Sequence, residues 1–294
     1  MKILNLAIAM ALGTGSVAMA AESFEKETKT WREEQERRLK SDDSWLAVVG
    51  LHWLKEGDNS VGASDRATVV LPEGAPLKLG VIRFEKNRAR MQFDTVDRVK
   101  VDGKAAEKGK TYDLATDESE KPTEISVGTV KFFLIKRANG TGVRVKDGAS
   151  AARKTFKGRK WFTPDLKYKL EAKWTELQTP KVLAVPDVLG NVNDEICPGY
   201  ATFTIDGKKT DLYPTKEGDR LFFVFKDKTA GKETYEAARF LYASAPQNGK
   251  VTLDFNRAVN PPCAFTSYAT CPLPPKENRL DVAIPAGELK PADH

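Results

Sequence analysis

The stretch "GYATFTIDGKKTDLYP" (residues 199–214) decides the fold class of this 294-residue chain. β-Branched and aromatic residues precede an Asp-Gly pair at Asp206 and Gly207, and a second short run that ends at Tyr213 follows it. An Asp-Gly pair between two such runs is a strong local signal for a β-hairpin. We therefore predict two antiparallel strands joined at residues 206–209.

Runs of the same kind lie on both sides of this hairpin. From residue 45 to 137, and again from residue 168 to 287, short apolar stretches alternate with turns of Gly, Asp, Asn and Pro. The last predicted strand is "LDVAIPAG" (280–287). This spacing is typical of strand meanders. We predict an all-β chain in which an N-terminal helix precedes a β-sandwich-like unit and a second antiparallel β-meander or barrel-like unit.

Residues 21–44 differ from the rest because they are rich in Glu, Lys and Arg. Within them Phe24, Trp31 and Leu39 recur at roughly helical spacing. This segment predicts a single N-terminal helix that ends near Ser41.

Two units are expected after this helix. Residues 45–150 form the predicted β-sandwich-like unit, and residues 151–294 form the predicted C-terminal β unit with a cysteine loop. The stretch "VKDGASAARKTFKGRKW" (145–161), with its small and charged residues, is the predicted linker.

Residues 1–20 have the composition of a secretory signal peptide. Lys2 provides a positive start, the apolar run "ILNLAIAMAL" is too short to span a bilayer, and "AMA" (18–20) supplies small residues for cleavage. No cysteine follows that site, which argues against a lipid anchor. We expect cleavage after Ala20 and a periplasmic or secreted protein in an oxidising compartment.

The charged residues are mixed along the chain. There are 47 basic and 41 acidic residues, with a formal net charge of +6, and the two signs are interspersed. This pattern predicts a solvated mixed surface, so we expect no nucleic-acid partner. No later stretch approaches about 18 apolar residues, so we expect no transmembrane anchor. No sequence pattern indicates an oligomeric state.

Two of the three cysteines lie eight positions apart in "PPCAFTSYATCPLPP" (261–275). In an oxidising compartment we expect Cys263 and Cys271 to form a disulfide, while Cys197 stays reduced and buried. Three alternatives stay open: a metal clip, which needs two more ligands; a nucleophilic thiolate, which needs a cationic partner; and two unpaired buried thiols.

Common catalytic motifs are absent from the sequence. The only histidines are His52, in an apolar run, and His294, the last residue, so a histidine-dependent triad or a histidine-rich zinc site has little to use. A packed structural role is the favoured interpretation of His52. There is also no Gly-x-Ser-x-Gly elbow, phosphate loop or Cys-x-x-Cys pair. We expect no metal and no cofactor.

Polar side chains are concentrated in the C-terminal half. The stretch "DKTAGKETY" (227–235) surrounds a glycine with hydroxyls and a carboxylate, and "LDFN" (253–256) places an Asp and an Asn on one face of a predicted strand. Two interpretations stay open: a polar ligand pocket, or a buried network that fixes the cysteine loop. The candidate cluster comprises Asp227, Thr229, Tyr235, Arg239, Asp254, Asn256 and Asn260.

The first half resembles forkhead-associated β-sandwiches. "EGDNSVGASDRATVVLP" (56–72) is similar to the glycine turn before their first recognition loop, and "VKVDGK" (99–104) to a following strand and turn. The phosphothreonine pocket of that family uses an Arg after the glycine and a Ser-x-x-His pair. Here Ala63 follows Gly62, the Ser-x-x-His pair is missing, and Asp102 replaces an Asn. We expect no phosphothreonine binding.

A second resemblance extends from about Trp31 to Glu288. It is carried by "FKDKTAGKETYEAARFLYA" (225–243), "LDFNRAVNPPCAFTSYATCPLPPKENRL" (253–280), "IPAGE" (284–288) and the early "GLHWLKEGDNSVG" (50–62). These motifs resemble domain-of-unknown-function family 1684. The resemblance implies an architecture and a residue cluster, and it brings no established activity.

The leading functional hypothesis is an exported binding or scaffolding module whose polar pocket holds a small polar or anionic molecule. The alternative is a hydrolase in which carboxylates such as Asp227 and Asp254 perform acid and base chemistry without histidine. A purely structural envelope protein is the third class, and it predicts no pocket.

Overall fold

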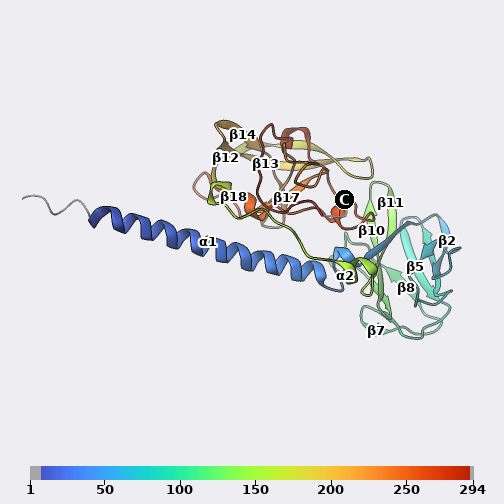
Figure 1. The fold of residues 1–294 in the computed structure, drawn as a ribbon. Coiled ribbons are helices and arrows are strands. Elements are labelled where there is room, and N and C mark those ends of the chain that lie inside the picture. The colour runs from blue at the N-terminus through green and yellow to red at the C-terminus, as the bar shows by residue number, and fades with distance from the viewer. Residues whose placement is uncertain (1–7, 292–294) are drawn as a thin grey trace, which may run out of the picture. The chain divides into compact units, whose positions relative to one another are not determined.

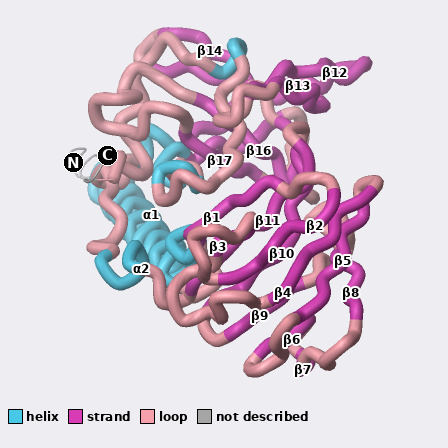
Figure 2. Tube along the Cα trace, turned by 90° about the vertical axis from the view of Figure 1, so that its right-hand side faces the viewer, coloured by secondary structure: helices cyan, strands magenta, loops and turns pink. Residues whose placement is uncertain are grey.

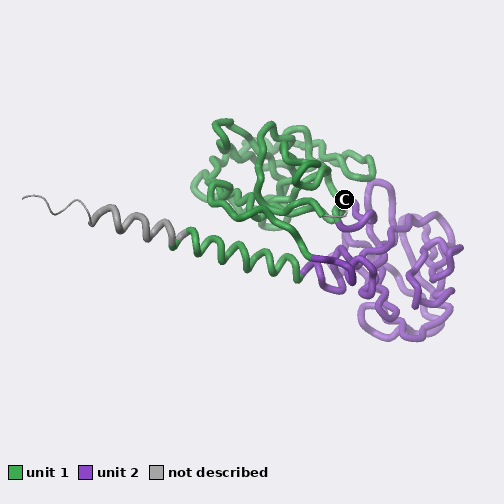
Figure 3. Tube along the Cα trace, viewed as in Figure 1, with its two compact units in different colours: residues 1–37, 158–264, 271–294 green, residues 38–157, 265–270 purple. Residues whose placement is uncertain are grey.

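The computed structural model describes residues 8–291, so the predicted signal peptide lies partly outside the described residues and His294 lies wholly outside them. The chain divides into two compact units, coloured separately in Figure 3. Unit 1 comprises Met1–Arg37, Gly158–Ala264 and Cys271–His294, and unit 2 comprises Arg38–Lys157 and Phe265–Thr270. The passage from Lys157 to Gly158 falls inside the stretch predicted as a linker, which also contains the short helix α2 (Ala151–Thr155).

The N-terminal helix α1 (Ile8–Lys40) is continuous (Figure 1). It ends one residue before Ser41, whose side-chain hydroxyl donates to the Arg38 carbonyl at 2.9 Å. Its unit 1 portion buries Phe24 and places Trp31 edge-on to Trp161 at 5.7 Å between ring centroids. Among the described residues, no helix is both long and apolar enough to cross a membrane.

Unit 2 is built from two sheets. The six-stranded sheet has the order β1-β11-β10-β9-β6-β7, with β1 Val48–Trp53, β6 Val99–Val101, β7 Lys104–Ala105, β9 Glu124–Val127, β10 Val130–Arg137 and β11 Gly140–Asp147. The five-stranded sheet, seen in Figure 2, has the order β3-β2-β4-β5-β8, with β2 Gly57–Gly62, β3 Val69–Val70, β4 Gly80–Glu85, β5 Arg88–Phe93 and β8 Thr111–Leu114. β2 and β3 pair in parallel.

The core of unit 2 follows from the period of two along its strands. In β5, Ala89, Met91 and Phe93 are buried while the residues between them are exposed. These side chains join Phe132 and Val145 of the other sheet in one apolar cluster. Both sheets therefore share a single core, as in a β-sandwich.

A short segment from far along the chain completes unit 2. Thr266 donates its hydroxyl to the Val48 carbonyl at 3.0 Å, although the two residues are 218 positions apart. The Thr270 hydroxyl accepts from Arg137 Nε at 3.1 Å and from Arg144 Nη2 at 3.3 Å. The cysteine loop thus starts and ends in unit 1, while its middle belongs to unit 2.

Unit 1 also contains two antiparallel sheets. The four-stranded sheet has the order β14-β13-β12-β18, with β12 Lys169–Pro186, β13 Val192–Ile205, β14 Lys208–Leu212 and β18 Lys250–Asp254. The three-stranded sheet has the order β15-β16-β17, with β15 Thr215–Glu217, β16 Arg220–Phe225 and β17 Arg239–Ala243. Both orders are linear, so unit 1 is a set of open antiparallel sheets. Together with the sheets of unit 2, they confirm the all-β prediction.

The Asp-Gly hairpin is also confirmed. Ile205 pairs with Lys208, and the two loop residues Asp206 and Gly207 have φ values of 48° and 76°, which a two-residue turn of this type requires. The strands that it joins carry Phe203 into the core, where its ring lies 5.4 Å from that of Phe255.

Two elements of unit 1 differ from the prediction. Strands β12 and β13 continue up to Pro186 and from Val192, although Pro180, Pro186 and Pro198 interrupt the strand pattern of the sequence. A register shift between Glu176 and Lys181 accommodates this region. Residues 280–287 do not form the predicted strand. Their carbonyls at Ile284 and Ala286 accept hydrogen bonds from a buried arginine instead.

Candidate functional site

Asp227 and Arg239 of the candidate cluster form a closed ion pair inside unit 1. Arg239 Nη1 lies 2.6 Å from Asp227 Oδ2, and both side chains are essentially inaccessible. The other carboxylate oxygen accepts from the Thr229 amide at 2.8 Å and from its hydroxyl at 2.5 Å. The hydroxyls of Thr229 and Thr234 lie 2.8 Å apart.

Arg239 also fixes the segment that follows the cysteine loop. Its guanidinium donates to the carbonyl of Ile284 at 3.0 Å and to that of Ala286. Burial lowers the pKa of Arg239, and the adjacent Asp227 opposes that shift. Both oxygens of Asp227 bind groups of the protein itself. Of the two interpretations of the candidate cluster, this part therefore fits the buried network.

Asp254 and Asn256 do not share a strand face, so that expectation was wrong. β18 ends at Asp254, and Asn256 lies in a 3-10 turn over Phe255–Arg257. The turn brings the two together in another way, because Asn256 donates its backbone amide and Nδ2 to Asp254 Oδ1 at 3.2 and 3.0 Å. Asn256 also exchanges two hydrogen bonds of 2.9 Å with the backbone of Asp165.

Asn260 belongs to a third group, centred on Glu288. The backbone amide of Asn260 donates to Glu288 Oε2 at 2.8 Å, and Arg159 Nη1 lies 2.6 Å from the same oxygen. Glu288 is almost fully buried, and this desolvation raises its pKa to about 7 despite the nearby arginine. The seven candidate residues therefore fall into separate local groups.

Cys263 and Cys271 do not form the predicted disulfide. Cys271 Sγ instead accepts a hydrogen bond from the Cys263 amide at 3.2 Å. The Cys271 carbonyl accepts from the Val188 amide at 3.1 Å, which ties this residue to the turn after β12. A hydrogen bond from Cys271 lowers the pKa of the half-buried Cys263. The Tyr235 hydroxyl donates to the Cys263 carbonyl at 3.1 Å.

Cys197 and His52 lie wholly or partly inside the protein. Cys197 is free and buried, as predicted, and its Sγ lies 2.9 Å from the Gly199 carbonyl. His52 lies half-buried in β1, and burial lowers its pKa. Within residues 8–291, no cluster of three or more His, Cys, Asp or Glu side chains could hold a metal ion.

One member of the candidate cluster, Asp254, lines a cavity of ≈ 680 Å³ in unit 1, which we call the polar groove. Its floor is the solvent face of the β12–β18 pair, where Lys169 lies opposite Asp254 and Glu171 opposite Thr252. The other face of the same pair carries Leu170, Ala172 and Leu253 toward the core. The alternation of the two strands therefore separates the groove from the core.

The remaining walls of the polar groove come from loops. Gln247 and Asn248 belong to the tight turn before β18, and Ser244 follows the end of β17. Arg257, in the 3-10 turn after β18, closes the groove beside Asp254, with Nε 3.4 Å from Asp254 Oδ2. The lining thus combines hydroxyl, amide, cationic and anionic groups.

Sequence reasoning missed most of the groove residues. A detectable signal exists in "KLEAK" (169–173) and "KVTLD" (250–254), where polar residues alternate with apolar ones, because alternate residues share a face. No local signal could have placed Glu288 beside Arg159, since the two residues are 129 positions apart.

One family model and two solved structures are similar to parts of this chain. The family model described as "Protein of unknown function (DUF1684)" matches residues 154–289. An uncharacterized protein of Haloarcula marismortui, solved by NMR, is 32% identical; the match covers 48% of this chain and 81% of that one, with a TM-score of 0.41. No curated protein matches significantly.

A second solved structure comes from a study of phosphothreonine-dependent FHA domain interactions. It is 19% identical, with a TM-score of 0.22, and the match covers 32% of this chain and 79% of that one. The matched family region contains every residue of the candidate cluster and of the polar groove. Through residues 154–289, the chain belongs to domain-of-unknown-function family 1684.

Proposed function

We propose that this protein is an exported binding protein that holds a small, hydroxyl-rich, anionic molecule in the polar groove. The observation that carries the proposal is the lining of the ≈ 680 Å³ cavity, in which charged and hydrogen-bonding side chains converge from three strands and two loops. Its volume lies within the range of about 300–1,000 Å³ that is usual for small-molecule sites. A strongly polar lining favours a ligand that can replace water at many hydrogen bonds.

Arg257 is the proposed anchor for the anionic group. Asp254 lies against its Nε, and the Trp31 ring lies 5.6 Å from its guanidinium carbon, so the planar group is held in place. Among the described residues no acceptor is recorded for its Nη atoms, and the side chain is 36% exposed. A guanidinium held in this way suits a carboxylate or phosphate group of the ligand.

The floor of the groove suits the rest of such a molecule. Thr252, Ser244 and Asn248 offer hydroxyl and amide groups that both donate and accept hydrogen bonds. Lys169 adds a cation, and the ion pair between Lys250 and Glu171 adds one group of each sign. Acidic sugars present the matching pattern of several hydroxyls and one carboxylate.

A binding experiment with three related sugars tests this proposal. We expect isothermal titration of the purified protein to detect glucuronate and to give weaker binding for glucose and for glucosamine, which lack the carboxylate. Replacing Arg257 with Gln should weaken glucuronate binding about tenfold or more, since a charge-assisted hydrogen bond is lost. Arg279→Gln removes an exposed arginine of the same unit that does not line the groove, and is the matched control.

Two results would contradict the proposed site. One is equal affinity for glucuronate in the native protein and in the Arg257→Gln variant. The other is an absence of detectable binding for all three sugars, which would remove the ligand class as well.

Export rests on the composition of residues 1–20, with Lys2, an apolar run and a final "AMA". N-terminal sequencing of the protein from an osmotic-shock fraction should give Ala21 as the first residue. An intact Met1 in the cytoplasmic fraction would contradict export.

A carboxylate-dependent hydrolase is the alternative function. Of the two carboxylates first considered for it, Asp227 is fully enclosed by its ion pair with Arg239. Asp254 also has partners, Asn256 and Arg257, but it lines the groove together with Glu171. Hydrolysis of a nitrophenyl glucuronide that is abolished by Asp254→Asn would favour this alternative over simple binding.

A further inference from the structure

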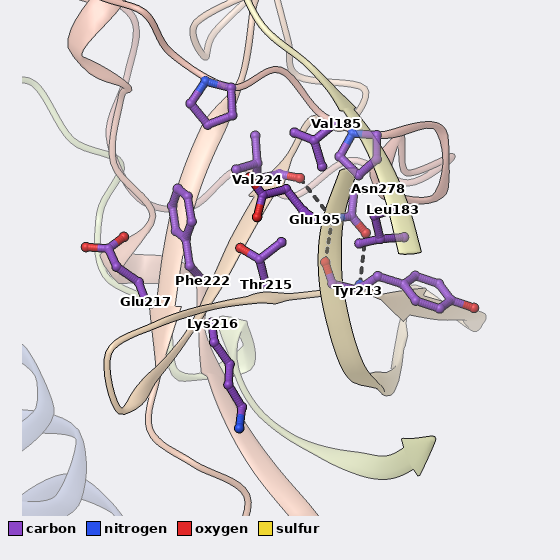
Figure 4. A pocket seen from close by; sticks show the side chains of 12 residues that line it. Leu183, Val185, Glu195, Tyr213, Thr215, Lys216, Glu217, Phe222, Val224 and Asn278 are labelled. Atoms are coloured by element: carbon purple, nitrogen blue, oxygen red, sulfur yellow. Dashed lines mark hydrogen bonds between the residues drawn. The ribbon is translucent and has the colours of Figure 1, made fainter. Parts of the chain in front are cut away.

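Unit 1 contains a second cavity of different chemistry, which we call the apolar pocket. It has a volume of ≈ 210 Å³, and Figure 4 shows the side chains around it. Its apolar walls are formed by two residues of β12, two of β16 and two prolines from the end of the cysteine loop: Leu183, Val185, Phe222, Val224, Pro272 and Pro275. Two prolines at the end of "PPCAFTSYATCPLPP" (261–275) therefore line a cavity.

The walls of the apolar pocket are fixed by hydrogen bonds. The buried Asn278 accepts from the Tyr213 amide at 2.9 Å and donates to the carbonyls of Tyr213 at 2.7 Å and Val224 at 3.0 Å (Figure 4). The Leu273 amide donates to the Pro186 carbonyl at 2.7 Å, which joins the proline segment to β12. A cavity with walls held in this way is preformed, and a ligand loses less free energy in ordering it.

The size of the cavity limits the occupant. An apolar cavity of about 150 Å³ accepts a benzene molecule in another protein. The apolar pocket is somewhat larger, so it can hold one ring or a short branched chain with a small polar group. It is too small for a peptide segment.

The polar groups at the apolar pocket favour a cation. Glu195 is exposed at the rim, and no ion pair is recorded for it among the described residues. Glu217 is already engaged by Arg220 at 3.7 Å, and Figure 4 shows the Lys216 side chain pointing away from the apolar walls. The Thr215 hydroxyl lies at the cavity and can accept a hydrogen bond from the ligand.

We propose that the apolar pocket is a separate binding site for a small apolar amine. Its hydrocarbon body contacts Leu183, Val185 and Phe222, and its ammonium group lies toward Glu195. Burial of the body supplies most of the affinity, and the carboxylate selects amines over anions.

Titration of three benzene derivatives tests this site. We expect benzylamine to shift the methyl NMR signals of Leu183, Val185 and Val224, with a dissociation constant below about 10 mM. Benzyl alcohol, which has the same body without the charge, should bind somewhat more weakly, and phenylacetate should bind weakest. Raising the salt concentration should weaken benzylamine binding and leave benzyl alcohol unaffected.

Variants separate the contributions of the body and of the charge. Glu195→Gln should weaken benzylamine binding about three- to fivefold, the range for an exposed ion pair, and leave benzyl alcohol unchanged. Val185→Phe should fill the cavity and abolish binding of both. Val182→Phe is its matched control, because Val182 is 53% exposed on the opposite face of β12.

The site is independent of the polar groove, so Arg257→Gln should bind benzylamine like the native protein. Absence of methyl shifts with benzylamine, or persistence of binding in Val185→Phe, would overturn the apolar pocket as a site. Phenylacetate binding as tight as that of benzylamine, or unchanged benzylamine binding in Glu195→Gln, would overturn its selectivity for amines.

Discussion

Arg239 and Asp227 form an ion pair that is fully enclosed by unit 1, with 1% and 0% of their side chains exposed. The pair joins the turn after β16 to the start of β17 and, through the Arg239 donors, to residues 284–286. Charges removed from water in this way are costly when one partner is lost, because the other stays buried without compensation.

We expect Arg239→Met to reduce the free energy of unfolding by about 3 to 5 kcal/mol. The double variant Asp227→Leu/Arg239→Met should be more stable than Arg239→Met alone, because no uncompensated carboxylate remains. Urea denaturation of the native protein and both variants provides the measurement. A double variant that is less stable than Arg239→Met would show that the remaining carboxylate is tolerated.

Glu288 should make stability depend on pH. Its pKa in the folded protein is about 7, above the ordinary value of 4.5, so the folded state retains this proton where the unfolded state has lost it. Its contribution is therefore fully present below pH 4.5 and is lost as the pH rises to about 7, by up to about 3 kcal/mol.

The Glu288→Gln variant isolates this effect, because glutamine does not titrate. Urea denaturation at intervals between pH 4.5 and 8 should show a smaller decline for the variant than for the native protein. Parallel stability profiles would mean that Glu288 does not carry the pH dependence.

Gly287 occupies a position that excludes a side chain. Its φ is 82°, and a Cβ atom there would lie 2.6 Å from the Ala258 carbonyl oxygen and 2.7 Å from that of Phe255. Gly218 also has a positive φ, of 60°, with open space around it. We expect Gly218→Ala to cost about 1 kcal/mol from backbone strain alone and Gly287→Ala to cost at least twice as much. Equal shifts in melting temperature for the two variants would contradict this comparison.

The three thiols should differ in reactivity. Cys263 is partly accessible and its pKa is lowered, whereas burial raises the pKa of Cys197. Iodoacetamide should therefore modify Cys263 first in the folded protein, and mass spectrometry should locate the label. All three cysteines should be modified after unfolding without a reductant. If Cys263 and Cys271 both resist modification under those conditions, a disulfide joins them and this expectation is wrong.

The sequence predicted well those strands that bury one face in the core and expose the other. The alternation in "RARMQF" (88–93) places every second residue inside, and the Asp206-Gly207 turn determines the pairing of its neighbours. The hairpin of β12 and β13 was seen only in part. Prolines interrupt its pattern, and Val182 and Ile196 are apolar residues on its exposed face.

The sequence indicated which residues belong to the candidate cluster. It did not predict which of them contact one another. Asp254 and Asn256 are close in sequence and in space, but a turn joins them where a strand was expected. Asp227 and Arg239 meet because β16 and β17 are antiparallel neighbours, and Glu288 meets Arg159 only in the folded chain. Local patterns carry no information on such distant pairings.

The predicted disulfide failed for a related reason. A separation of eight residues suggested a simple closed ring, yet residues 265–270 between the two cysteines belong to the other unit. Cys271 is held by the turn after β12, a partner that the loop sequence does not reveal.

The interleaving of the two units has a consequence for the order in which the chain can fold. Domains generally fold as they emerge from the ribosome, the N-terminal one first. Unit 2 contains most of the earlier residues, yet the hydrogen-bond donor for the Val48 carbonyl is Thr266. Synthesis must therefore pass through more than a hundred residues of unit 1 before unit 2 receives its last segment. A nascent chain released at residue 157 would lack the segment that completes it.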